Sequence, residues 1–145
     1  AFIRRVIGAD STPYLATPSN NGLLSASDKA IINGITNRVI NKGWFSGINI
    51  STTTGSLPID GDLYSAVAST VGTNTTFVLV TMANTMANTN YKVVFDVESQ
   101  GTLVLDSDCM APIFRKISTT QFTCAVREVV GHGQNLKIHF EVIQL

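Results

Sequence analysis

The stretch "NLKIHFEVIQ" (135–144) alternates apolar and polar side chains almost residue by residue. Leu136, Ile138, Phe140 and Val142 fall on one side of this alternation. Successive side chains of a β-strand point to opposite faces of its sheet, so a period of two indicates a strand with one buried face.

Similar patterns recur along the chain. We expect strands at "TTFVLVTM" (75–82), which is almost continuously apolar, at "NYKVVFDVE" (90–98) and at "QFTCAVRE" (121–128). The predicted inward residues of the last two are Tyr91, Val93, Phe95, Val97, Phe122, Cys124 and Val126. Weaker strands are predicted at 47–51, 101–105 and 113–118, and "DGDLYSAVAS" (60–69) stays open between a helical turn and a loop. Short strands separated by Gly, Asn, Ser and Thr turns are typical of a mainly β, antiparallel β-sandwich, predicted here for residues 44–145.

The first 43 residues have a different character. They contain Pro13, Pro18 and an Asn-Asn-Gly turn without a sustained period, which indicates extended chain. "NKGWFSG" (41–47), with its two glycines, is predicted to be the junction between this segment and the sandwich.

A short helix is predicted at about residues 25–34. Ser25 and Asp28 are spaced as a capping box, and Gly34 can end the helix. So short a helix is marginal by itself in water, yet Leu24, Ile31 and Ile35 are apolar. These three side chains therefore need a partner surface.

Composition limits the classes of partner. The formal net charge is +0 at pH 7 and 14% of residues are charged, which argues against nucleic acid or an acidic membrane surface. No apolar run approaches the roughly 18 residues that span a bilayer. The chain starts at Ala1, and we expect a piece of a longer polypeptide. Cys109 and Cys124 match no zinc or redox pattern, so we predict a buried free thiol at Cys124, no metal site and no cofactor.

One motif resembles a known family. The segment "ATPSNNGLLSASDKAIINGI" (16–35) is similar to a motif that recurs in tail fibres of bacteriophages and phage-like bacteriocins, where it links the fibre shaft to later domains. The matching positions are Gly22, Leu23, Leu24, Ser25, Asp28, Lys29, Ile32, Gly34 and Ile35. The strands of the C-terminal half also resemble the β-sandwich receptor-binding knobs of such fibres.

The resemblance implies a biological setting. Residues 1–43 would be a shaft segment intertwined in a parallel homotrimer and continuous with the upstream fibre, with Leu24, Ile31 and Ile35 in the trimer core. Residues 44–145 would be the knob at the distal end of the fibre in the virion, assembled in the host cytoplasm. The implied function is adhesion to a bacterial surface receptor, a saccharide such as lipopolysaccharide.

Several residues are candidates for the receptor site. The loop amides Asn84, Asn88 and Asn90 come first, and His132, Gln134 and Asn135 of "GHGQN" second, since both groups can hydrogen-bond sugar hydroxyls. Trp44 is either an aromatic platform for a sugar or a packing residue at the junction. Tyr64 is a further aromatic candidate, whereas Tyr91 is expected in the core.

Enzymatic function is not predicted. No nucleophile can be paired with His132, and His139 is expected on the outward side of its strand. Asp60 with Asp62 and Asp106 with Asp108 are acid pairs, but their turn-like settings favour bonds to backbone over glycoside chemistry. A polysaccharide-degrading fragment and a purely structural fibre module remain alternatives, and three copies of His132 around one axial ion is a further one.

Overall fold

The structure is a computed structural model, and it describes residue 28 and residues 39–70, 74–131 and 133–145. The predicted helix at 25–34, the core candidates Leu24, Ile31 and Ile35, and the loop residue His132 lie outside the described residues. Residues 39–145 form one compact unit.

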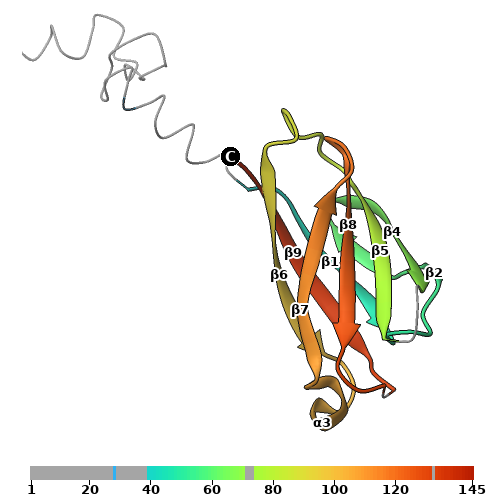
Figure 1. The fold of residues 1–145 in the computed structure, drawn as a ribbon. Helices are drawn as coiled ribbons and strands as arrows, with labels where there is room; N and C mark the ends of the chain where they lie inside the picture. Colours follow the sequence, from blue (N-terminus) through green and yellow to red (C-terminus); the bar gives the residue numbers. More distant parts are fainter. Residues whose placement is uncertain (1–27, 29–38, 71–73, 132) are drawn as a thin grey trace, which may run out of the picture. The chain divides into compact units, whose positions relative to one another are not determined.

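The unit is built almost entirely from strands (Figure 1). In chain order the elements are β1 (Val39–Ile48), β2 (Gly55–Ser56), β3 (Ile59–Gly61), β4 (Leu63–Thr70), β5 (Thr75–Met82), β6 (Tyr91–Ser99), α3 (Leu103–Asp106), β7 (Cys109–Lys116), β8 (Gln121–Glu128) and β9 (Leu136–Gln144).

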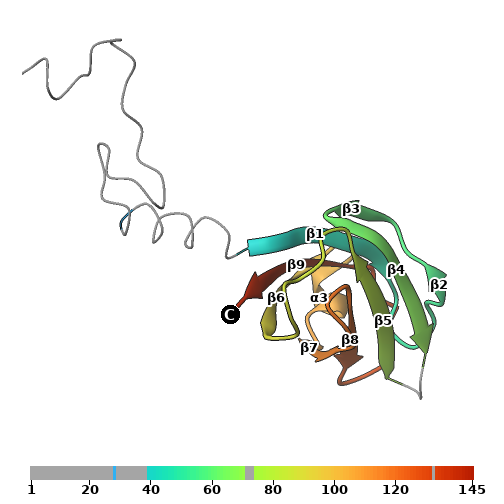
Figure 2. The same cartoon turned by 90° about the horizontal axis from the view of Figure 1, so that it is seen from above.

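The strands form two antiparallel sheets, as the sequence predicted. One has four strands in the order β3-β1-β9-β6, and the other has five in the order β2-β4-β5-β8-β7. Figure 2 shows the two sheets facing each other, with β3, β1, β9 and β6 on one side and β2, β4, β5, β8 and β7 on the other. The chain changes sheet several times, and at the crossing between β3 and β4 Asp62 is the single intervening residue.

That crossing depends on glycine. Gly61 has a φ of +98°, and a Cβ there would lie 2.4 Å from the carbonyl oxygen of Lys42. Gly43, its register partner on β1, has similarly no room, since a Cβ would lie 2.4 Å from the carbonyl oxygen of Asp60. Two glycines therefore allow β1 and β3 to approach where the chain changes sheet.

The core lies between the sheets and follows the predicted alternation. Phe122, Cys124 and Val126 are fully buried, and so are the inward residues of β9, Leu136, Ile138, Phe140 and Val142, at 0–2% exposure. Phe122 packs edge-on against Phe140 with ring centroids 5.6 Å apart, so the aromatic rings join the two sheets. Cys124 is a free, buried thiol, as predicted.

Tyr91 is buried as predicted, and its hydroxyl lies 3.0 Å from the carbonyl oxygens of both Ser118 and Gln121. Farther along the same strand the pattern weakens: Phe95 is half-buried and Val97 is 39% exposed. β6 is an edge strand of its sheet, so neighbouring strands cover its inward side incompletely.

The predicted junction at 41–47 is wrong, because these residues are the middle of β1. Asn41 reads as a turn residue but is fully buried, and Gly43 sits at the close approach to β3. The sandwich therefore begins at Val39, and the boundary expected between residues 43 and 44 falls inside a strand. Of the strand predicted at 47–51, only residues 47 and 48 are in a strand, since β1 ends at Ile48 and a turn follows.

Two further segments differ from expectation. Residues 60–69, left open between helix and loop, form the end of β3 and most of β4. The strand predicted at 101–105 is instead the single helical turn α3, because the Asp106 carboxylate bonds to Ser99 and to the Gly101 and Asn135 amides and holds the chain in a compact loop. β7 confirms the strand predicted at 113–118 as far as Lys116.

Candidate functional site

A groove of about 650 Å³ lies on the outer face of the four-stranded sheet. Its lining comes from all four strands, β3, β1, β9 and β6. The polar or charged lining residues, together with Trp44, are Lys42, Asp60, Asp62, Asp96, His139 and Glu141.

Strand register sets four of these side chains in one row. Asp60 on β3 lies opposite Trp44 on β1, Trp44 lies opposite His139 on β9, and His139 lies opposite Asp96 on β6. Neighbouring strands are about 4.8 Å apart, so the row crosses the sheet over about 14 Å. An indole and an imidazole thus lie between two carboxylates.

A second row lies two residues along the strands. Lys42 on β1 is opposite Glu141 on β9, and Glu141 is opposite Val94 on β6. Asp62 borders this row at the crossing between sheets, where its carboxylate accepts a bond from the Lys42 amide at 3.1 Å. Residues of both rows line the groove.

The ring of Trp44 is supported from outside the groove. The Lys137 ammonium lies 4.5 Å from the centroid of the Trp44 ring, a cation–π contact. Trp44 is among the residues that line the groove, and Lys137 is not.

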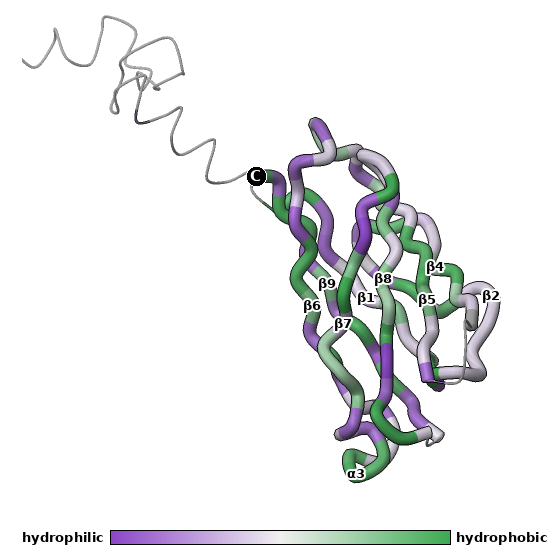
Figure 3. Tube along the Cα trace, in the orientation of Figure 1, coloured by the Kyte–Doolittle hydropathy of each residue, from purple (hydrophilic) through white to green (hydrophobic). Residues whose placement is uncertain are grey.

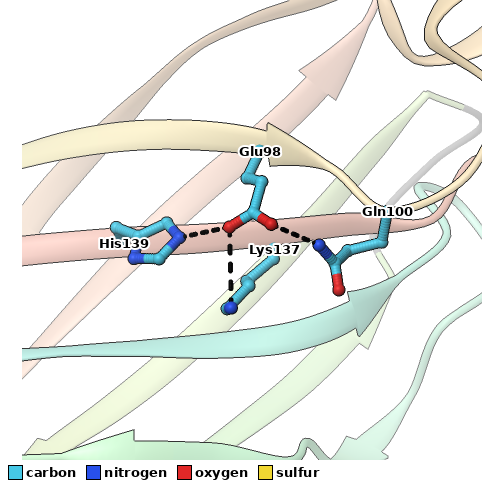
Figure 4. Close-up of polar contacts among 4 residues, drawn as sticks. All are labelled: Glu98, Gln100, Lys137 and His139. Atoms are coloured by element: carbon cyan, nitrogen blue, oxygen red, sulfur yellow. Dashed lines mark hydrogen bonds and ion pairs between the residues drawn. The ribbon is translucent and has the colours of Figure 1, made fainter.

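Glu98 connects this support to His139 (Figure 4). One Glu98 carboxylate oxygen lies 2.6 Å from His139 Nε2 and 3.5 Å from Lys137 Nζ, and the other accepts a bond from Gln100. The bond with His139 is the main reason that the pKa of Glu98 is lowered, and the charge of Lys137 adds to it. Lys137 thus contacts Trp44, Glu98 contacts His139, and the ion pair between Lys137 and Glu98 joins the two contacts.

Three carboxylates of the groove differ from that of Glu98 in their contacts. Among the described residues, Asp60, Asp96 and Glu141 make no side-chain hydrogen bond or ion pair. No three His, Cys, Asp or Glu side chains in the described part of the chain gather closely enough to hold a metal ion. The carboxylates are spread along the groove and present single acceptors to a ligand.

The first-choice loop, residues 83–90, lies at the end of the sandwich where β1 begins (Figure 1). Asn84 donates from its side chain to Ile40 O at 3.1 Å, and its backbone exchanges two bonds with Asn41. The side-chain oxygen Oδ1 of Asn88 accepts a bond from Gln144 at 3.0 Å, and Gln144 also donates to Asn90 O at 2.7 Å. These bonds fasten the loop to β1 and β9, although all three Asn side chains are exposed.

The second-choice residues lie at the opposite end. Gln134 is 6% exposed and donates to Asp108 at 3.1 Å, and the Asn135 amide donates to Asp106 at 3.2 Å. Both acids of this predicted pair thus stabilise the α3 loop. The same end carries Leu103 and Val104 of α3, exposed at 73% and 80%, which Figure 3 colours as hydrophobic.

Of the candidate receptor-site residues that the structure describes, Trp44 alone lines the groove, and the acid pair Asp60 and Asp62 lines it as well. Sequence reasoning missed Asp96 and Glu141 as its neighbours and treated His139 only as an outward residue. The outward positions were readable from the alternation, but strand order and register were needed to bring them together.

No protein-family model, curated protein or solved structure matches this chain. Among the described residues, no helix combines the length and the apolar character that a membrane crossing requires.

Proposed function

We propose that the chain is the receptor-binding tip of a phage or phage-like tail fibre, and that it binds a bacterial surface saccharide in the Trp44 groove without altering it. The observation that carries the proposal is the placing of Trp44 between carboxylates in an open groove. The apolar face of a sugar ring can stack on an indole while carboxylates accept hydrogen bonds from its hydroxyls.

Three further features support a saccharide ligand. The groove is long and open enough for a short oligosaccharide, and its residues come from strands, which hold side chains more precisely than loops do. The balanced charge of the chain does not favour nucleic acid. The motif at 16–35 resembles a tail-fibre segment. This resemblance favours a saccharide of the bacterial surface as the ligand.

The proposal includes assembly as a parallel homotrimer through residues 1–43. It rests on the resemblance and on the apolar Leu24, Ile31 and Ile35 of the predicted helix. Sedimentation equilibrium of the whole chain should give three times the chain mass, and a monomer or dimer mass would exclude the arrangement. Ile31→Asp should dissociate the trimer, because it places an unpaired charge in an apolar contact.

The functional test uses labelled whole chain and a panel of bacterial strains that differ in surface polysaccharide. We expect strain-selective binding that Trp44→Ala weakens at least tenfold. The matched control is Tyr64→Ala, which removes an aromatic ring that is 74% exposed on β4, in the other sheet. Circular dichroism and thermal melting of both variants check that each remains folded.

The same incubation separates the alternatives. Reducing ends released into the supernatant would favour a polysaccharide-degrading enzyme. Absence of binding to every strain and to purified polysaccharide would favour a purely structural module. Binding lost in Tyr64→Ala but kept in Trp44→Ala would move the site to the other sheet.

A further inference from the structure

We infer that the Trp44 groove selects saccharides that carry a free amino group, in preference to acetylated, neutral or acidic ones. The inference rests on the proposed saccharide-binding function and specifies its ligand class.

Charge is the first argument. The groove is lined by four carboxylates, those of Asp60, Asp62, Asp96 and Glu141, against one lysine, Lys42. The chain as a whole has equal numbers of acidic and basic residues, so this face concentrates negative charge. An acidic sugar or a phosphate would meet repulsion here, whereas a protonated amine would be attracted.

The availability of these carboxylates is the second argument. Glu98, two residues from Asp96 on β6, is occupied by Lys137, His139 and Gln100, as Figure 4 shows. Asp60, Asp96 and Glu141 have no such cation or donor within the described residues. Lys137 and His139 are thus engaged by Glu98, whereas Asp60, Asp96 and Glu141 make no ion pair with Lys42, the lysine that lines the groove, and are open to an external cation.

The third argument is the position of Trp44. Lys137 already shows that this indole accepts an ammonium group, which lies 4.5 Å from the ring centroid. Trp44 also lines the groove, with Asp60 and His139 as its neighbours on the adjacent strands. A sugar lying against Trp44 can therefore bring an amino substituent to Asp60 on one side or Asp96 on the other.

The test compares oligosaccharides of one backbone. Whole chain is titrated at pH 6 with a tetrasaccharide of glucosamine, with its fully N-acetylated counterpart, and with the glucose tetrasaccharide of the same linkage, by calorimetry and indole fluorescence. An oligogalacturonate of equal length supplies the acidic ligand. We expect the glucosamine oligomer to bind at least fivefold more tightly than the other three.

Variants then locate the selectivity. Asp60→Asn and Asp96→Asn keep the size of the side chain and remove its charge, and each should reduce the preference for the amine at least twofold. Higher salt should reduce the same preference, because exposed charges are screened. Trp44→Ala should weaken binding of all the oligosaccharides.

The outcomes separate the two proposals. Equal or tighter binding of the acetylated or neutral oligomer, still lost in Trp44→Ala, overturns the amine selectivity and keeps the saccharide groove. An amine preference that survives both Asn variants also overturns this inference. If no oligosaccharide and no surface polysaccharide binds in a Trp44-dependent way, both proposals fail.

Discussion

Asn41 provides a sharp test of how the sandwich is held together at the end where β1 begins. Its side chain is fully buried, and the side-chain amide makes two hydrogen bonds with the backbone of Asn84. Nδ2 donates to Asn84 O and Oδ1 accepts from Asn84 N, both at 2.9 Å. The amide thus pairs with loop 83–90 as a neighbouring strand would. Asn41→Ala removes both bonds at once.

The expected loss follows from those two bonds. Each intramolecular hydrogen bond contributes about 0.5–1.5 kcal/mol net, so the pair contributes about 1–3 kcal/mol. The deleted amide also contacts the sulfurs of Met82 and Met86 at 3.5 Å, and the small cavity left there adds to the cost. We therefore expect a loss of about 2–3 kcal/mol in the free energy of unfolding.

The assay is urea unfolding of the whole chain at fixed protein concentration, followed by circular dichroism, with thermal melting as a second readout. The matched control is Asn84→Ala, which keeps the backbone groups that Asn41 binds and loses only one exposed bond to Ile40 O. It should cost less than about 1 kcal/mol. The reasoning is refuted if Asn41→Ala costs under about 0.5 kcal/mol, or if Asn84→Ala costs as much.

Three other results are expected. Gly61→Ala should cost more than about 3 kcal/mol in urea unfolding, because its Cβ would meet backbone; Gly55→Ala, with a φ of +89° and open space, should cost about 1–2 kcal/mol. Burial raises the pKa of Cys109 to about 11 and that of Cys124 to about 12, so thiol titration at pH 8 should be slow for Cys109 and should detect Cys124 only after unfolding. The bond to His139 lowers the pKa of Glu98, so its stabilising effect is full above the ordinary carboxyl value and disappears as the pH falls through the lowered folded value; NMR titration should find that pKa below 4.5. A thiol at Cys124 that reacts in the folded chain, or a Glu98 pKa at or above 4.5, would contradict the respective argument.

The sequence by itself determined the class of fold and much of the core. Alternation at 90–98, 121–128 and 135–144 identified the strands and nearly all their buried residues, because a strand with one face in the core must repeat every two residues. It also gave the buried thiol of Cys124 and the core position of Tyr91. These are local consequences of the chain's own pattern.

Tertiary structure decided what the pattern left ambiguous. "NKGWFSG" has the composition of a linker, yet it is the middle of β1, because Asn41 finds its partners in a loop more than forty residues away and Gly43 fits against Gly61. The groove depends still more on distant contacts. Asp60, Trp44, His139 and Asp96 come from four strands, and only the strand order β3-β1-β9-β6 and its register place them in one row. Alternation fixes the face that a side chain occupies, but the choice of neighbouring strand comes from the packing of the whole sandwich.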